Sequence, residues 1–264
     1  MTIMHIAGTI FILLVLGHLM LWKARDTTSF FKNTPIIFGH RGALHNAPEN
    51  TLEAYQSAIK KGLSALEIDI VSTCDGEIVC SHNFDLERES DGYGFIDEIK
   101  YKDLSVVNFG INKFSGQVAK IVRLEKVLKI IPENVLLNIE IKTISFFDLK
   151  PLFRLNRLIK KNAQNRKIMV SSFNPLVVLL VKYMNRRIIT AMIFETLNHF
   201  YLVNFVHPDC INMEAGLLNQ KFINWAKKRH LRIGAWTVNT KSAIQWIKKL
   251  GVDAIYTDRP EYTL

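Results

Sequence analysis

Short apolar runs alternate with segments of helical periodicity along most of the chain. Eight runs of four to seven residues have the apolar pattern of buried strands. Helical segments separate most of them, for example at residues 222–230 and 241–250. This alternation predicts a parallel sheet, and eight units with similar strand ends favour a closed TIM-type (β/α)8 barrel over an open α/β sheet. The predicted strands cover residues 36–39, 66–70, 135–141, 168–172, 189–194, 210–213, 232–238 and 254–257.

The N-terminal segment has a different pattern. Residues 3–22 contain no Asp, Glu, Lys or Arg. At about 1.5 Å per residue, twenty helical residues can cross a hydrocarbon core of roughly 30 Å. A cleaved signal peptide is the alternative, but no basic side chain precedes the segment and no A-x-A pattern follows it. We therefore expect one uncleaved transmembrane helix at residues 1–22, a linker at residues 23–34 and a barrel domain at residues 35–264.

Flanking charges predict the orientation of this anchor. Lys23, Arg25 and Lys32 follow the apolar segment, so the positive-inside rule places the catalytic domain on the cytoplasmic face of a membrane. The linker can reach at most about 40 Å, which keeps the domain near the bilayer. The three cysteines suggest no disulfide framework, which agrees with a cytoplasmic location.

The net charge of +10 is concentrated in one region. Residues 150–187 hold ten Lys or Arg and no Asp or Glu, with apolar residues between them. Nucleic acid is one possible partner, but no recognised nucleic-acid motif accompanies the stretch, and we expect none to bind. Attraction to an anionic membrane surface is the simpler explanation. A solvated helical face is the remaining alternative.

The first candidate site residues follow the strand at residues 36–39. His40 and Arg41 lie at its carboxyl end, where α/β folds bind ligands. Arginine can hold a phosphate with two parallel donors, and histidine can move a proton near neutral pH. Asn50 can cap the next helix, with Glu53 three residues on. Helix capping does not explain Glu49.

Acidic residues mark the second strand. Glu67 and Asp69 are two residues apart, so both point to one face, and apolar neighbours occupy the other. Two buried carboxylates repel each other unless a cation lies between them, and oxygen ligands favour Mg²⁺ or Ca²⁺. An Asp-Gly turn at residues 75–76 then returns the chain and brings His82 towards them. A solvated hairpin histidine is the alternative.

The third predicted strand repeats the alternation. Glu140 and Lys142 share a face, which barrel geometry directs inward. Glu140 would be a third metal ligand, and Lys142 would bind a phosphate. An exposed ion pair is the alternative, but flanking isoleucines disfavour it. Trp236 lies near a later strand end, where it belongs either to the core or to the pocket.

In order and spacing, these motifs resemble the glycerophosphodiester phosphodiesterase family, as a membrane-anchored member. The resemblance covers about residues 36–262. Its motifs are HRG, PENT, E-x-D, T-x-DG, SH, LERESDGYG, NIEIK, VSSFNP, AWTVN and IYTDRP. Asn83 stands where the family usually has Asp, and Ser90 where it usually has Thr. The change at Asn83 bears on how His82 is oriented and how basic it is.

The resemblance implies metal-dependent hydrolysis of glycerophosphodiesters to an alcohol and glycerol 3-phosphate. We expect one divalent cation, Mg²⁺ or Ca²⁺. The implied ligands are Glu67, Asp69 and Glu140; the implied acid–base pair is His40 and His82; and Arg41, Glu49, Lys142 and Trp236 bind substrate. The resemblance favours a two-step route through a cyclic phosphate.

The membrane anchor widens the expected substrates to lysophospholipids, which would yield lysophosphatidate. Two alternatives stay open. One is a phospholipase D-type lyase that stops at the cyclic phosphate. The other is a non-catalytic, membrane-tethered barrel that binds lipid head groups.

Overall fold

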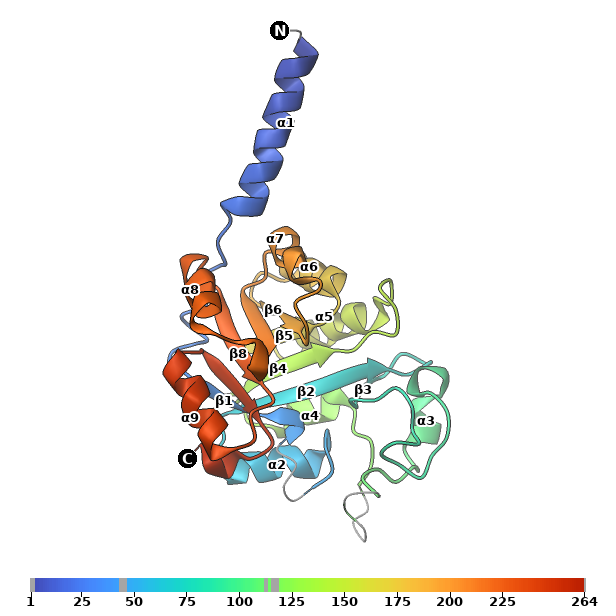
Figure 1. Cartoon of the computed structure of the whole chain (residues 1–264). Coiled ribbons are helices and arrows are strands. Elements are labelled where there is room, and N and C mark those ends of the chain that lie inside the picture. Colours follow the sequence, from blue (N-terminus) through green and yellow to red (C-terminus); the bar gives the residue numbers. More distant parts are fainter. Residues whose placement is uncertain (1–2, 43–46, 112–113, 115–118, 264) are drawn as a thin grey trace.

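A computed structural model of the chain shows a closed barrel with one helix projecting from it (Figure 1). The structure describes residues 3–42, 47–111, 114 and 119–263. Eight parallel strands form the barrel in the order β1-β9-β8-β7-β6-β5-β4-β2, and pairing of Gly39 in β1 with Leu66 in β2 closes it. The predicted TIM-type barrel is confirmed.

The barrel strands lie within two residues of the predicted bounds at either end. They are β1 (Ile36–Gly39), β2 (Ala65–Ser72), β4 (Leu136–Ile141), β5 (Ile168–Ser172), β6 (Ile189–Phe194), β7 (Cys210–Glu214), β8 (Arg232–Trp236) and β9 (Ala254–Thr257). The helices are α1 (Ile3–Met20), α2 (Leu52–Lys60), α3 (Tyr101–Leu104), α4 (Leu124–Ile130), α5 (Lys150–Asn162), α6 (Pro175–Met184), α7 (Val203–Val206), α8 (Gln220–Lys228) and α9 (Lys241–Leu250). Short 3-10 turns occur at His40–Gly42, Ile96–Glu98, Phe200–Leu202, Ala215–Leu217 and Pro260–Tyr262.

The start of α2 differs from the prediction. Thr51, not Asn50, is the N-cap residue, and its hydroxyl accepts a hydrogen bond from the backbone N–H of Ala54. Asn50 has a φ of 56° and is buried. Its side chain instead donates to Asp69 and accepts from the Tyr55 hydroxyl. The residue predicted to cap a helix therefore positions an acidic residue of the site.

The predicted hairpin after β2 is confirmed. β3 (Ile78–Cys80) pairs antiparallel with β2, with Ile70 opposite Cys80. The connection from β3 to α4 then folds beside the barrel around its own apolar cluster, which includes Leu86, Ile96 and Leu104. This arrangement brings the chain directly after β3 to the carboxyl end of β2.

Much of the segment 22–34, which contains the whole predicted linker, packs against the barrel. Phe30 and Phe31 are buried with the apolar residues at the amino ends of the strands. The Nε of Arg25 donates to Asp209 at 2.8 Å, and the Asp209 side chain is fully buried. The backbone N–H of Ala24 also donates to the carbonyl of Arg229. This segment therefore behaves as part of the barrel.

The helix α1 leaves this packed segment and extends away from the barrel (Figure 1). It ends at Met20. Trp22 follows it, stacks on His207 at 4.5 Å and donates to Asn204, so it packs on the barrel. Within the described residues, no helix is both long enough and apolar enough to cross a membrane. The predicted transmembrane helix is not confirmed.

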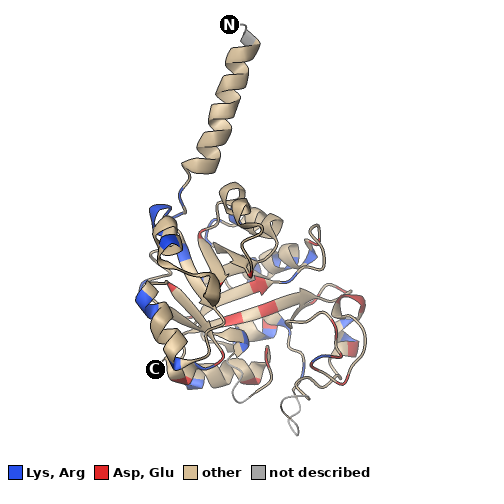
Figure 2. Ribbon diagram, in the orientation of Figure 1, with Lys and Arg blue, Asp and Glu red and all other residues tan. Residues whose placement is uncertain are grey.

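Basic and acidic residues lie on different layers of the fold. Figure 2 shows Lys and Arg on outer helices, α8 and α9 among them, and acidic residues on β2 and β4 at the centre. In α5 the residues Leu152, Leu155 and Ile159 are buried, so most of the apolar residues within the basic stretch belong to the core. Within that stretch, Arg166 is buried and donates to three backbone carbonyls around the end of α4.

Candidate active site

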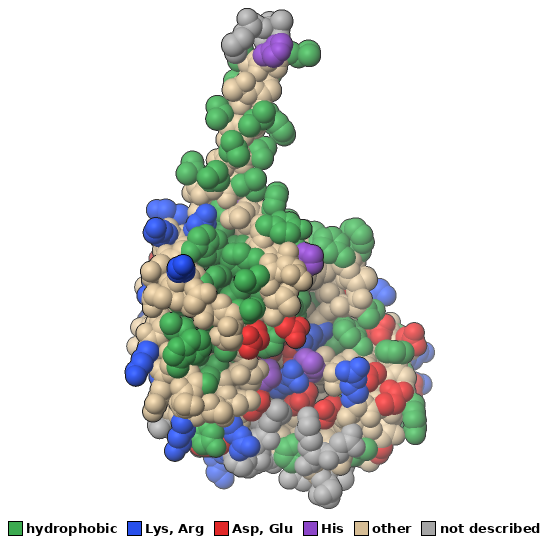
Figure 3. Space-filling model, in the orientation of Figure 1, with side chains coloured by type: hydrophobic (Ala, Val, Ile, Leu, Met, Phe, Trp, Pro, Cys, Tyr) green, Lys and Arg blue, Asp and Glu red, His purple; other side chains and the backbone are tan. Residues whose placement is uncertain are grey.

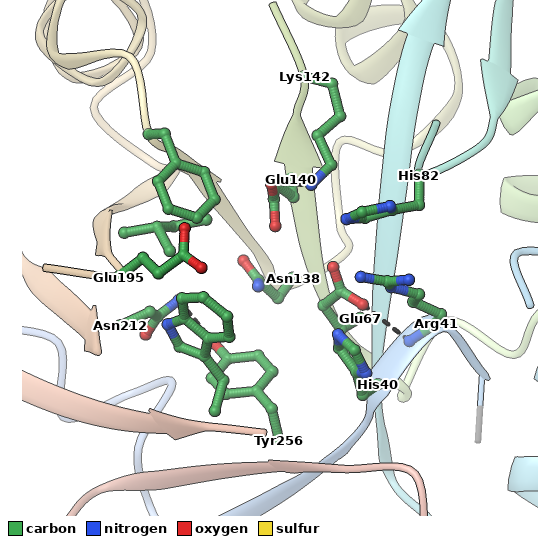
Figure 4. Close-up of a pocket in the computed structure, with 13 residues that line it drawn as sticks. His40, Arg41, Glu67, His82, Asn138, Glu140, Lys142, Glu195, Asn212 and Tyr256 are labelled. Carbon is green, nitrogen blue, oxygen red and sulfur yellow. Dashed lines mark hydrogen bonds and ion pairs between the residues drawn. The ribbon is translucent and has the colours of Figure 1, made fainter. Parts of the chain in front are cut away.

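A cavity of about 370 Å³ opens at the carboxyl ends of the barrel strands (Figure 4). It contains most of the predicted site residues and several that were not predicted. Its lining consists of His40, Arg41, Glu67, His82, Asn138, Glu140, Lys142, Phe173, Ile193, Glu195, Asn212, Trp236 and Tyr256. From the outside it appears as a hollow in which acidic, basic and histidine side chains lie together (Figure 3).

Glu67, Asp69 and Glu140 form one acidic cluster. Parallel pairing of β2 and β4 sets Asp69 beside Glu140, and alternation places Glu67 on the same inward face. One carboxylate oxygen of each residue lies within 4.8 Å of the others, and all three side chains are buried. Hard divalent ions prefer oxygen donors at separations of this kind. The cluster therefore fits a divalent cation, as predicted.

The three carboxylates differ electrostatically. Burial raises the pKa of Glu67 well above its usual value, and the charges of Asp69 and Glu140 raise it further. Burial acts the same way on Asp69, but Lys142 and Arg41 outweigh it and lower its pKa. The Nζ of Lys142 lies 3.3 Å from Asp69 and 2.5 Å from Glu140. Asp69 thus stays ionised within an ion-pair network, whereas Glu67 carries most of the unrelieved repulsion.

Arg41 connects the cluster to the first strand. It has a left-handed backbone, with φ 51° and ψ 26°, which turns its N–H towards Glu67 at 2.8 Å. Its guanidinium lies 3.3 Å from Asp69 and 3.0 Å from Glu49. Glu49 does not line the cavity. It holds Arg41, which lines the cavity.

His40 is held by a carboxylate that sequence analysis did not single out. Its Nδ1 lies 2.7 Å from Asp258, which directly follows β9. Asn239 donates to the other oxygen of Asp258. Burial would raise the pKa of Asp258, but the hydrogen bond and charge of His40, together with Asn239 and Arg41, outweigh burial and lower it. With Nδ1 engaged, Nε2 is the ring atom left for substrate.

His82 has a neutral partner instead. Its Nδ1 lies 3.0 Å from the side-chain oxygen of Asn83. Burial, together with Lys142 and Arg41, lowers the pKa of His82 to about 4, although Asp69 opposes the shift. His82 is therefore a neutral imidazole at pH 7. The hairpin returns it to the cavity, as predicted, and Figure 4 shows it above Arg41.

Sequence analysis assigned no role to Glu195, Asn212, Phe173 and Tyr256, which line the cavity. Glu195 and Phe173 each directly follow a predicted strand, so the rule that ligands bind at carboxyl ends could have found them. Asn138 belonged to a quoted motif, and its inward face follows from its spacing to Glu140. The ring of Trp236 does line the cavity, at the end of β8.

Two buried polar atoms in the cavity have no hydrogen-bond or ion-pair partner among the described residues. They are Asn138 Oδ1 and Trp236 Nε1. Buried polar groups are rarely left unpaired in native proteins, so these atoms indicate a polar ligand. One is an acceptor and the other a donor, which suits a cation together with an oxygen-rich substrate.

The residues also match a known family. A sequence profile described as the glycerophosphoryl diester phosphodiesterase family matches residues 40–262. The chain belongs to this family. A glycerophosphodiester phosphodiesterase from Caldanaerobacter subterraneus is 30% identical over 239 residues, covering 86% of this chain and 95% of that protein. Another from Bacillus altitudinis is 26% identical and covers 85% and 95%.

Solved structures share the fold. A phosphodiesterase from Oleispira antarctica, in complex with the product sn-glycerol-3-phosphate, superposes with a TM-score of 0.80 at 23% identity, covering 86% of this chain and 94% of that one. A Thermotoga maritima glycerophosphodiester phosphodiesterase gives 0.71 at 23% identity, covering 88% and 97%. Family membership and the close sequence relatives establish the activity. The chain is an enzyme that hydrolyses glycerophosphodiesters, as predicted.

Proposed function

We propose that the enzyme cleaves glycerophosphodiesters in two steps, through a cyclic phosphate, to an alcohol and glycerol 3-phosphate. The observation that carries the proposal is the convergence of two histidines, Arg41, Lys142 and the acidic cluster on one cavity. A divalent ion, Mg²⁺ or Ca²⁺, held by Glu67, Asp69 and Glu140 would neutralise charge that develops on the phosphate oxygens. Arg41 and Lys142 hold the phosphate in position.

Proton transfer falls to the histidines. His82, neutral at pH 7, accepts the proton of a glycerol hydroxyl through Nε2 as that oxygen attacks phosphorus. His40, backed by the Asp258 carboxylate, donates a proton to the departing alcohol oxygen. Water opens the cyclic phosphate in the second step, with the two roles exchanged. Both products then leave, and each ring regains its starting protonation state.

Phosphorus NMR of the products tests this route. Glycerophosphocholine with Mg²⁺ or Ca²⁺ should give transient cyclic phosphate followed by glycerol 3-phosphate, and a chelator should stop turnover. Accumulation of the cyclic product alone would indicate the lyase. Full turnover in chelator would remove the metal from the mechanism.

We also propose lysophospholipids as substrates. The loop after Lys142, at the edge of the cavity, exposes Ile144, Phe146 and Phe147, with 57%, 51% and 79% of their surface accessible. An acyl chain that leaves the cavity would find apolar contact on this loop. The product would be a lysophosphatidate, and lysophosphatidylcholine in vesicles is the direct test.

We further propose that α1 holds the enzyme at a membrane, with the barrel on the cytoplasmic face. Apolar side chains are exposed around all sides of α1, and others gather near its base (Figure 3). Water disfavours such a surface, and lipid would cover it. Lys23 and Lys32 follow the apolar segment. The anchor and the short path to the barrel would keep the cavity close to lipid head groups.

Fractionation and topology mapping test the anchor. The full chain should stay with membranes after a high-salt wash, whereas a chain lacking residues 1–20 should be released. Protease added to sealed vesicles shows on which side the barrel lies. A tag at the N-terminus shows whether the segment crosses the bilayer or enters it from one side. Release of the full chain by salt alone would contradict the proposal.

A further inference from the structure

The carboxylate of Glu195 has no part in the mechanism, yet it enters the cavity. Glu195 directly follows β6, and in the ring of eight strands β6 lies opposite β1, which carries His40 and Arg41. Figure 4 shows its side chain reaching into the cavity from the side opposite Glu67 and Arg41. Within the part of the chain that the structure describes, no ion pair or hydrogen bond engages this carboxylate.

Two aromatic rings lie on the same side of the cavity. Phe173 and Trp236 meet edge to face, with centroids 5.9 Å apart and planes at 89°. Both line the cavity together with Glu195. A carboxylate beside aromatic rings is the chemistry that binds organic ammonium ions, because ring faces attract cations and the carboxylate adds a full opposite charge.

The charges of the site lead to the same ligand. The positive charges of a divalent ion, Arg41 and Lys142 would not exceed the negative charges of the acidic cluster, Glu49 and a phosphodiester, so none of them is left for Glu195. The charge of Glu195 is left over. A cation on the substrate would pair with it, whereas beside a neutral head group this exposed carboxylate would be solvated by water alone.

We propose that Glu195, with Phe173 and Trp236, selects diesters whose alcohol carries a positively charged amine, such as choline or ethanolamine. This inference rests on the proposed function, because it places the phosphate between Arg41 and Lys142. The leaving oxygen then lies beside His40, and the head group extends across the barrel towards β6. Glu195 is a specificity-determining residue here and takes no part in proton transfer.

Glu195→Gln tests the charge while keeping the shape of the side chain. The measurement is kcat/KM for glycerophosphocholine and glycerophosphoethanolamine relative to glycerophosphoinositol and glycerophosphoglycerol, whose head groups are uncharged. The wild type should prefer the cationic pair. In Glu195→Gln this preference should fall about tenfold, through KM more than kcat, since a ground-state contact is lost.

Glu214→Gln is the matched control. Glu214 ends the neighbouring strand β7 but does not line the cavity, so the same change in charge should leave the preference as it is in the wild type. Glu195 is exposed, which makes misfolding of its variants improbable, and Glu195→Ala provides a second variant of the same position. A thermal melt verifies each fold.

Three results would overturn the inference. One is a wild type without preference for cationic head groups. Another is a Glu195→Gln preference within twofold of the wild type. The third is an equal loss on all four diesters, which would show that Glu195 contacts the glycerol common to them.

Binding of choline alone separates this inference from the proposed function. Ligand-observed NMR on the metal-loaded protein should detect choline with the wild type and Glu214→Gln, and a much weaker signal with Glu195→Gln. If no diester is turned over but this pattern appears, the proposed function fails and the cation site stands. If diesters are turned over but choline binds all three proteins equally, the cation site fails alone.

Discussion

Glu67 and Asp69 illustrate how two residues of one motif can have opposite effects on the stability of the metal-free fold. Both are buried and both belong to the acidic cluster. Asp69 is surrounded by Lys142, Arg41 and the Asn50 amide, so its negative charge is stabilised. Glu67 faces the other two carboxylates, and its contact with Arg41 is through the backbone N–H.

Substitutions that remove these two charges should therefore change the unfolding free energy of the metal-free protein in opposite directions. Because ionised Glu67 costs free energy above its raised pKa, Glu67→Gln should stabilise the metal-free protein at pH 8 by about 1 kcal/mol. Asp69→Asn leaves two buried cations with less compensation and should destabilise it by about 3 kcal/mol. Both should abolish activity. Urea unfolding in chelator measures the two changes, and shifts in the same direction would contradict the electrostatic assignment.

Asn83 is the hydrogen-bond partner of His82, whose pKa is lowered mainly by burial. A carboxylate in place of its amide would stabilise the imidazolium and raise the pKa of His82 from about 4. Since His82 must be neutral to accept a proton, Asn83→Asp should move the acid limb of the kcat/KM profile to higher pH, by about one unit. Asn83→Ala, which adds no charge, should lower the rate without that upward move. If the acid limb of the kcat/KM profile does not move in Asn83→Asp, that limb reports the titration of a group other than His82.

Local patterns identified the residues that alternate along strands. Glu67, Asp69, Glu140 and Lys142 were predictable because a period of two fixes the face of each side chain. Residues whose positions depend on contacts distant in sequence could not be predicted. His40 and Asp258 are 218 positions apart, and only closure of the barrel brings them to 2.7 Å. Asn50 suits both a helix cap and a hydrogen bond to Asp69, and tertiary contacts decided between them.

At the scale of elements, the strands followed their apolar runs closely because buried parallel strands are nearly all apolar. The basic stretch at residues 150–187 was less informative. Charge counts do not show which side of α5 faces the core, and burial of Leu152 and Leu155 leaves its exposed side mostly polar. The loop after β4 attracted no attention in the sequence, although its phenylalanines are among the most exposed apolar residues near the cavity.

That loop offers a test of the lipid proposal. Phe146→Ser with Phe147→Ser removes exposed apolar surface next to the cavity but no described catalytic contact. The variant should lose at least about tenfold in turnover of lysophosphatidylcholine in vesicles, because each of the two exposed rings contributes about 1–2 kcal/mol when lipid covers it. Glycerophosphocholine turnover reports whether the pocket itself is intact. Equal rates on vesicles for variant and wild type would remove the loop from lipid binding.

At the scale of the molecule, the N-terminal segment completes the barrel. Phe30 and Phe31 cover the amino ends of the strands, and Arg25 compensates the buried charge of Asp209. Sequence analysis predicted a linker there because twelve polar and mixed residues between two apolar regions have no helical or strand pattern. Packing of such a segment depends on a partner surface that is formed only by the folded chain.

Two truncations separate this role from that of α1. Removal of residues 1–20 should leave the unfolding free energy nearly unchanged, since Trp22 and Arg25 keep their contacts. Removal of residues 1–34 should cost at least about 3 kcal/mol, because Asp209 is then buried without its guanidinium partner. Thermal and urea unfolding in detergent measure both. A barrel of residues 35–264 as stable as the longer chain would show that the segment only connects.

The joint between α1 and the barrel restricts how the enzyme can search for substrate. His18 in the last turn of α1 and Trp22 just after the helix both contact His207, so the end of α1 itself packs on the barrel. If α1 embeds in lipid, as proposed, the cavity would keep one orientation and one height above the bilayer, and the enzyme would search for substrate only within that plane. Its rate on lipid would then follow the mole fraction of substrate in that plane, and dilution of the suspension would leave it unchanged.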